Sequence, residues 1–220
     1  MRVKELSFGL TLAFSFLSIS PYQNQVLAAE FSETEDIKED YSFELEHSDR
    51  TEVVEGSEIT NTEISSSDNL LEPNSIIGGD NRVKDPSPRS FPALATVYLE
   101  ITWENGKNTW MTGAMIGKDL VMTCGHAVFS VNNYGWAKKI TVHAGVVNSA
   151  SLYISEGRTV MTPREWKDSK SANDDIALIR LNSDLGSKTG WYEVIKEVAV
   201  GDNFVTRGYP EDRYLPMSLS

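Results

Sequence analysis

Histidines are the side chains that most readily move a proton near neutral pH, and this chain has three, His47, His126 and His143. His47 lies in an acidic stretch, where we expect it to be solvated. His143 lies within an alternating pattern typical of a strand, where a packed or surface histidine is expected. His126 differs because it follows an apolar run and then Thr123-Cys124-Gly125, whose small residues permit a tight turn. This position would present the imidazole from the rigid end of a strand, although composition alone leaves a purely structural histidine open.

A carboxylate that could orient this imidazole is Asp175. Asp174 and Asp175 directly precede the apolar run 176–179, which would draw a carboxylate toward the core. A buried carboxylate needs a partner because an unpaired buried charge is very costly. In a catalytic triad the partner is a histidine, which the acid orients while the histidine takes a proton from a serine. Ordinary turn chemistry is the alternative for two adjacent aspartates.

The elements that must position these residues are short strands. Apolar runs alternate with turns from residue 91 onward, Asn105-Gly106 is a strong hairpin signal, and no stretch shows a convincing amphipathic helix. This spacing predicts an all-β barrel or sandwich. The expected strands are 93–101, 110–116, 120–124, 139–146, 176–181 and 197–207.

Charge is distributed very unevenly along the 220 residues. The formal net charge is -12, but residues 30–75 alone hold 15 acidic and 2 basic residues, so residues 76–220 are balanced. No basic stripe indicates nucleic-acid binding. The single cysteine, Cys124, excludes an intrachain disulfide and a cysteine-based metal site.

The first 75 residues read as an export signal followed by a pro-segment. Arg2 and Lys4 precede a short apolar run at 8–19, and Val26-Leu27-Ala28-Ala29 supplies small residues for signal cleavage, so residues 1–29 predict a signal peptide. The acidic segment 30–75 lacks hydrophobic periodicity and predicts a disordered pro-segment. We therefore expect an extracellular protein with no membrane attachment after signal removal. A buried N-terminal helix and a solvated spacer are the respective alternatives.

Several stretches resemble one family. Residues 111–126, ending in Thr123-Cys124-Gly125-His126, resemble the histidine segment of bacterial glutamyl endopeptidases, which are trypsin-like serine proteases with two β-barrels. The resemblance runs from about residue 75 to 215. The other matching stretches, in order, are 76–82 (IIGGDNR) at the mature N-terminus, 163–166 (PREW) and 175–178 (DIAL) at the aspartate, and 190–192 (GWY) and 208–213 (GYPEDR) in the second barrel.

This resemblance implies a chymotrypsin-like double β-barrel, with a complete first barrel at about 76–185 and an incomplete second barrel at 186–220. It makes His126 the general base and Asp175 the acid that orients it. An activating protease would cleave near residues 74–76, and the new amino terminus, near Ile76, would help to bind an acidic substrate side chain. The implied partners are protein or peptide substrates of a monomer that needs no cofactor or metal.

The family's nucleophile is the serine of a Gly-x-Ser-Gly segment, and this motif does not occur in the printed sequence. Ser218 and Ser220 lie in no glycine-rich turn, so neither is expected to act as the nucleophile. Cys124 stands where the family usually has a small residue, and it is expected to be packed rather than reactive. A thiol nucleophile is the alternative, but Cys124 lies only two positions from His126 on the same turn. We therefore expect the chain as it stands to be inactive, as a fragment or an interrupted copy of a protease.

Two other functions remain open. A secreted, non-catalytic binding protein could keep the protease scaffold, although the retained histidine and aspartate argue weakly against it. A metal-dependent hydrolase could use His126 and His143 with Asp174 or Asp175 as ligands. No His-Glu-x-x-His motif supports that reading.

Overall fold

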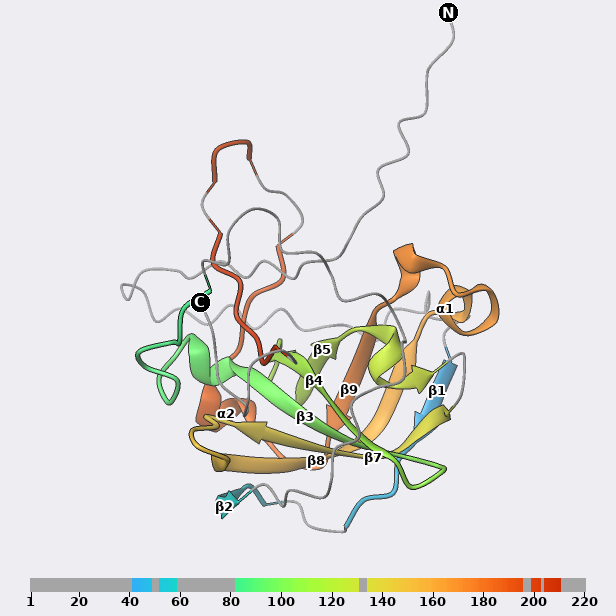
Figure 1. The fold of residues 1–220 in the computed structure, drawn as a ribbon, viewed down its shortest axis with the longest axis horizontal. Coiled ribbons are helices and arrows are strands. Elements are labelled where there is room, and N and C mark those ends of the chain that lie inside the picture. The colour runs from blue at the N-terminus through green and yellow to red at the C-terminus, as the bar shows by residue number, and fades with distance from the viewer. Residues whose placement is uncertain are drawn as a thin grey trace, which may run out of the picture.

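Six antiparallel strands close into a barrel. The computed structural model describes residues 41–48, 52–58, 82–130, 134–195, 199–202 and 204–210. Around the barrel the strand order is β3-β4-β5-β9-β8-β7, and β7 pairs again with β3 (Figure 1). The strands are β3 (Thr96–Trp103), β4 (Asn108–Met115), β5 (Leu120–Thr123), β7 (Gly135–Ala144), β8 (Ala150–Thr162) and β9 (Ala177–Leu181). The all-β prediction is confirmed.

Alternating side chains fill the barrel. On β3 the inward positions are Val97, Leu99, Ile101 and Trp103, each at most 1% exposed. They meet apolar side chains from the other strands in one core cluster. The alternation of residues that predicted these strands therefore corresponds to side chains that point in turn into and out of the barrel. The remaining elements are short: β6 (Phe129–Ser130), α1 (Arg164–Ser169), α2 (Gly186–Thr189), and the 3-10 turns η1 (Ala93–Ala95), η2 (Gly125–Ala127) and η3 (Ala172–Asp174).

The longest strand, β8, was not predicted from the sequence. Its inward positions include Ser151, Ser155 and Gly157, which interrupt the apolar alternation. The two serines are satisfied by buried hydrogen bonds, with His143 and Ser183 respectively. A register shift between Gly157 and Thr159 disrupts the pattern further. Because small and polar residues lie on its inner face, the apolar alternation that would predict a strand is absent from β8.

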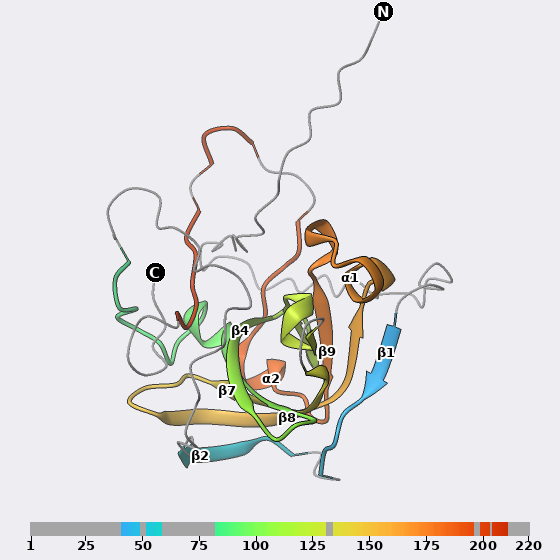
Figure 2. The same cartoon turned by 45° about the vertical axis from the view of Figure 1, so that its right-hand side comes forward.

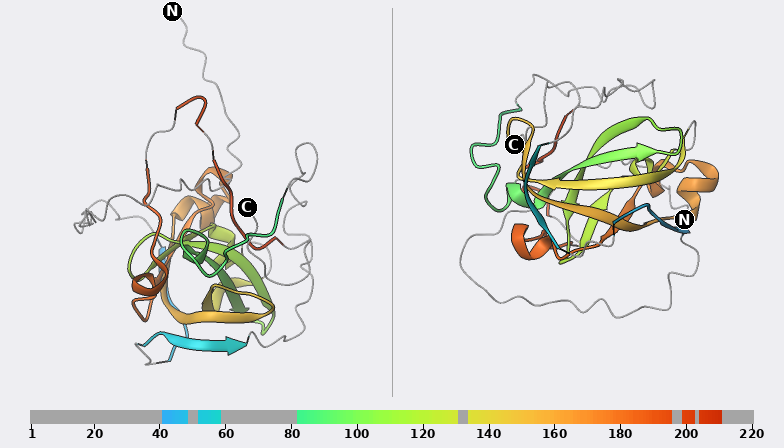
Figure 3. Two further views of the ribbon diagram at one scale, coloured as in Figure 1. Left: turned by 90° about the vertical axis from the view of Figure 1, so that its left-hand side faces the viewer. Right: turned by 90° about the horizontal axis from the view of Figure 1, so that it is seen from below.

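The acidic segment contributes two strands, which corrects part of the disorder predicted for residues 30–75. β1 (Tyr41–Glu44) and β2 (Val54–Glu58) both pair antiparallel with β8. Figures 1 and 3 show β2 running beneath β8, outside the closed barrel. Hydrogen bonds between their backbone and that of β8 give these residues a regular structure that their acidic composition does not predict. The role of residues 30–75 as a pro-segment stays a prediction.

After β9 the chain folds back onto one end of the barrel. The backbone N–H of Tyr192 donates to the Met115 carbonyl and its hydroxyl donates to the Pro92 carbonyl, both at 2.8 Å. The backbone N–H of Tyr209 donates to Thr112 Oγ1 at 2.8 Å. The strand expected at 197–207 is not formed by the described residues there, so that prediction is wrong for them. Several apolar side chains of this region are exposed, namely Trp191, Val194, Ile195, Val200, Phe204 and Val205.

A buried ion pair ties this returning segment to the start of the folded domain. Arg207 Nε donates to Asp85 Oδ2 at 3.0 Å, and these side chains are 13% and 5% exposed. Asp85 Oδ1 also accepts the backbone N–H of Ser87 at 2.9 Å. Residues 82–90 and 204–210 are therefore held together through one carboxylate. None of the helices within the described ranges is long and apolar enough to cross a membrane.

Candidate active site

The pairing of β5 with β9 places His126 beside Asp175. In the antiparallel register Thr123 lies opposite Ala177. The residues just after β5 and just before β9 must therefore lie at the same end of the barrel. His126 lies in η2, directly after β5, and Asp175 lies between η3 and β9. Two strand ends, 49 residues apart in the sequence, thus converge on one point.

Both oxygens of Asp175 bind His126. Its Oδ2 lies 2.7 Å from His126 Nδ1, and its Oδ1 accepts the backbone N–H of His126 at 2.8 Å. The two side chains are 27% and 17% exposed. A carboxylate can only accept, so Nδ1 carries the hydrogen and in the neutral imidazole Nε2 is the free acceptor. This is the tautomer that can take a proton from a hydroxyl on the Nε2 side.

The residues around the pair restrict its geometry. A Cβ on Gly125 would lie 2.7 Å from Trp166 Cδ1 and 3.0 Å from Asp175 Oδ1, so glycine is required there for close approach. The Trp166 ring lies 6.2 Å from the His126 ring, centre to centre, and its indole N–H donates to the Phe129 carbonyl at 3.1 Å. Sequence reasoning gave Trp166 no role, although it lies in the Pro-Arg-Glu-Trp stretch. The glycine and the tryptophan together hold the imidazole against its carboxylate.

Cys124 lies on the other side of the imidazole. Its Sγ is 3.3 Å from His126 Nε2, the atom to which a nucleophile would give its proton. The thiol is only partly buried. The expectation of a merely packed cysteine missed this contact, because spacing along a turn does not show which ring nitrogen a side chain meets. Because a ring nitrogen has a single hydrogen-bonding position, the thiol occupies the position at Nε2 that a nucleophile would use.

These contacts shift the protonation of His126. Burial lowers the pKa of His126, but the hydrogen bonds with Asp175 and Cys124, and the negative charge beside it, outweigh burial and raise that pKa to about 10. The site therefore favours the imidazolium, held by an adjacent carboxylate. To act as a base, His126 must first lose this proton, and the same contacts would then stabilise the imidazolium that forms once it takes a proton from a nucleophile.

The raised pKa predicts a pH-dependent contribution of His126 to stability. Because the folded-state pKa of about 10 exceeds the ordinary value of 6.5, the contribution is fully present below about pH 6.5 and is lost as the pH rises to about 10. We expect His126→Gln to lower the free energy of unfolding by about 1 to 3 kcal/mol at pH 6.5 and by much less at pH 10. Urea unfolding of both proteins at each pH measures this difference. A loss that is equal at both pH values would contradict it.

The other predicted site residues lie elsewhere. His143 is buried in β7, where Nδ1 lies 2.8 Å from Ser151 Oγ and Nε2 lies 3.3 Å from Glu100 Oε2. His47 is exposed and its Nδ1 lies 2.8 Å from the Leu45 carbonyl. Ile76 lies outside the described residues. His126 and His143 therefore belong to separate networks, and the metal site that would need both of them is not assembled.

Within the described ranges, no three or more His, Cys, Asp or Glu side chains are arranged to hold a metal ion. Asp174, the other carboxylate considered, uses its backbone N–H to donate to the Ser171 carbonyl at 2.9 Å. The side chains that meet at the site are the His126 imidazole, the Asp175 carboxylate and the Cys124 thiol.

Comparisons with known proteins show the family of the chain. The family model described as trypsin matches residues 76–219. A curated relative from Bacillus subtilis (strain 168), named "Extracellular metalloprotease", is 35% identical over 157 residues, which are 69% of this chain and 50% of the relative. The chain thus spans about half the length of this relative.

Two solved protease structures share the fold over part of this chain. The protease Anisep from Arthrobacter nicotinovorans is 19% identical with a TM-score of 0.51, over 58% of this chain and 63% of that one. The thermostable serine protease AL20 from an extremophilic microorganism is 14% identical with a TM-score of 0.50, over the same shares. A Glu endopeptidase in complex with MPD is 23% identical with a TM-score of 0.49, over 56% of this chain and 55% of that one.

Proposed function

The chain belongs to the trypsin family, and from this premise we propose that it is the precursor of a secreted serine endopeptidase in which His126 is the general base and Asp175 orients it. The observation that carries the proposal is the double contact of one carboxylate with the imidazole and the backbone of the same histidine. The relative named as extracellular supports secretion, as does the signal-like sequence at residues 1–29.

We further propose a preference for glutamate before the scissile bond. The support is the resemblance of residues 76–82, 163–166 and 208–213 to glutamyl endopeptidases. In that reading a protease cleaves near residues 74–76, and the new amino terminus at or near Ile76 contacts the acidic substrate side chain. The ion pair of Asp85 with Arg207 supports this proposal indirectly, because it anchors the segment that follows the new terminus.

The nucleophile is the part that the 220 printed residues do not supply. No Gly-x-Ser-Gly motif is among them, so we propose that the chain alone has essentially no peptidase activity. The hydroxyl of a serine on the Nε2 side of His126 would complete the proton path, displacing the Cys124 thiol.

The test is to extend the chain with the C-terminal part of a glutamyl endopeptidase and measure cleavage of matched peptides. We expect the extended protein to cleave after glutamate far faster than after alanine or lysine. The unextended chain and an extended chain with the donor serine changed to alanine are the controls, and both should be inactive. A folded extended protein without peptidase activity would favour the alternative, a non-catalytic binding protein on the same scaffold.

A further inference from the structure

The acidic segment completes both edges of β8. Tyr153 and Ile154 pair with β7 and also with β2, so β2 lies on the edge opposite β7. Thr159 and Val160 pair with β9 and also with β1, so β1 lies on the edge opposite β9. Figure 2 shows β1 along the side of the barrel and β2 beneath β8. We call the described residues 41–48 and 52–58 the strap.

The strap is anchored by a side chain inside the barrel core. Leu45 is 4% exposed and belongs to the main core cluster, and the partly buried Phe43 and Val53 pack against that cluster. Phe43 also stacks on Trp136, with ring centres 5.2 Å apart. Removing this leucine would leave a cavity in the core, which is among the largest single losses that a protein core can suffer.

A glycine in the barrel wall leaves room for this leucine. Gly157 lies at the register shift of β8, and a Cβ at this position would lie 2.9 Å from Leu45 Cδ1 and 3.0 Å from Ile179 Cγ2. Because Gly157 has no side chain, Leu45 can occupy the space that a Cβ at this position would take. Leu45 and Gly157 are thus complementary in shape, as two residues of one core are.

Hydrogen bonds hold the strap on each side of this anchor. The backbone N–H groups of Leu45 and Glu46 donate to the carbonyls of Arg158 and Lys138, both at 2.8 Å. The backbone N–H of Ser48 donates to Glu156 Oε2 at 2.6 Å. The Asn182 amide donates to the Ser48 carbonyl at 2.6 Å. These bonds use the backbone of the strap, so they do not depend on its exposed acidic side chains.

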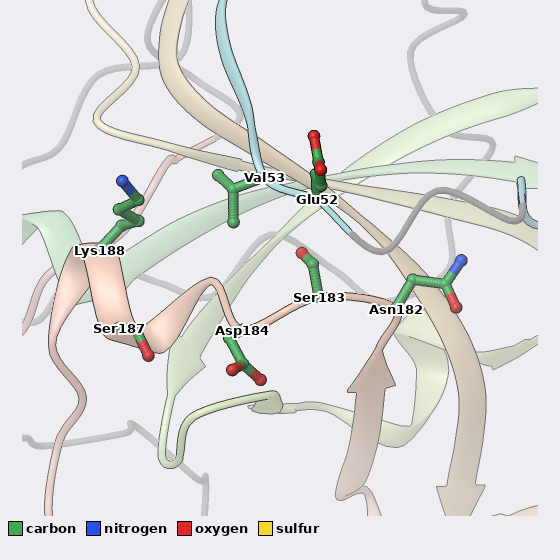
Figure 4. Close-up of a pocket in the computed structure, with 7 residues that line it drawn as sticks. All are labelled: Glu52, Val53, Asn182, Ser183, Asp184, Ser187 and Lys188. Carbon is green, nitrogen blue, oxygen red and sulfur yellow. The ribbon is translucent and has the colours of Figure 1, made fainter.

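The charges of the strap contribute less. Glu46 lies 3.4 Å from Lys138 and Glu55 lies 3.8 Å from Lys188, and all four side chains are well exposed. Exposed ion pairs of this kind stabilise little. Figure 4 shows that Glu52 and Val53, at the start of the second part of the strap, border an open pocket. The other lining residues are Asn182, Ser183, Asp184, Ser187 and Lys188. The strength of attachment therefore lies at the Leu45 end.

We propose that the strap is a permanent part of the barrel, and that it stays bound as a separate, non-covalent chain after the connection between residues 58 and 82 is cut. A pro-segment would ordinarily be expected to leave once it is cleaved. If the strap left, the barrel would lose Leu45 from its core and β8 would lose its hydrogen-bonding partners β1 and β2, so the release of the strap is strongly disfavoured. This inference does not depend on peptidase activity.

The test uses the full chain, with residues 63–69 replaced by the recognition sequence of a site-specific protease. After cleavage, the two pieces should elute together in size-exclusion chromatography at micromolar concentration, and mass spectrometry should find both in one peak. Separation of the wild-type pieces while the barrel stays folded would overturn the proposal. Because no catalytic step is measured, failure here is distinguishable from failure of the proposed peptidase function.

Competing peptides then test the anchor without changing the barrel. A synthetic peptide of residues 41–58 should exchange into the cleaved complex when present in excess, and the Leu45→Ala peptide should need about 30-fold more to reach the same exchange. The Glu55→Ala peptide is the matched control and should exchange like the wild type. Equal behaviour of the Leu45→Ala and Glu55→Ala peptides would show that the leucine is not the anchor and would overturn the proposal.

Discussion

Replacing His126 with alanine in the extended, serine-containing chain is expected to lower kcat about a million-fold, because the members of a triad act as a unit. In the proposed mechanism Nε2 of His126 takes the proton of the nucleophile while Asp175 Oδ2, 2.7 Å from Nδ1, orients the ring. Asp175→Asn keeps the shape but reverses the tautomer preference, so a loss of about ten-thousandfold is expected. Steady-state cleavage of a glutamyl peptide measures both.

The matched control for these two variants is His47→Ala. His47 is exposed in the strap and its Nδ1 lies 2.8 Å from the nearby Leu45 carbonyl, away from Asp175, so kcat should not change. Folding of every variant is checked by tryptophan fluorescence, since Trp166 lies beside the site. A folded His126→Ala protein with full activity would remove this histidine from the mechanism and refute the assigned base.

The second large effect is expected on stability. Asp85→Ala would leave Arg207 buried without its carboxylate, because Arg207 Nη1 already has no hydrogen-bond partner among the described residues. We expect a loss of about 3 to 5 kcal/mol in the free energy of unfolding, as for other buried pairs that lose one partner. Thermal and urea unfolding of the unextended chain measure it.

Asp119→Ala is the control for that experiment. Asp119 Oδ2 lies 2.8 Å from Arg180 Nη1, a bond of similar length, but these side chains are 36% and 50% exposed. Its loss should cost less than about 1 kcal/mol. In the double variant Asp85→Leu with Arg207→Met the loss should be smaller than in Asp85→Ala, since no charge is left unpaired. Similar losses for Asp85→Ala and Asp119→Ala would mean that burial does not set the strength of these pairs.

Residue types at strand ends made His126 and Asp175 candidates, and the resemblance to glutamyl endopeptidases gave them their expected roles. An apolar run before His126 and an apolar run after Asp175 required two strands, and antiparallel pairing of those strands brings the two side chains together. The contact of Cys124 with Nε2 could not be predicted in this way. Neither could the support from Trp166. Both depend on how side chains rotate at the end of the barrel, which spacing along the chain does not encode.

The fold was predictable where hydrophobic periodicity reports the barrel wall, as on β3. It was not predictable on β8, whose inner face uses serines and a glycine. The strap was missed for a related reason. Acidic composition describes its exposed side chains, whereas its order comes from backbone bonds to β8 and from one leucine, Leu45, that fits beside Gly157. Average composition cannot reveal a single anchoring residue.

The pairing of β8 on both edges also bears on how copies of the molecule behave toward one another at high concentration. A strand with unpaired N–H and C=O groups is a template on which another chain can add. β1 and β2 occupy those groups along opposite edges at the two ends of β8. Molecules that keep β1 and β2 should therefore remain monomeric. Molecules that lack them would pair through the exposed edges of β8 and eventually aggregate.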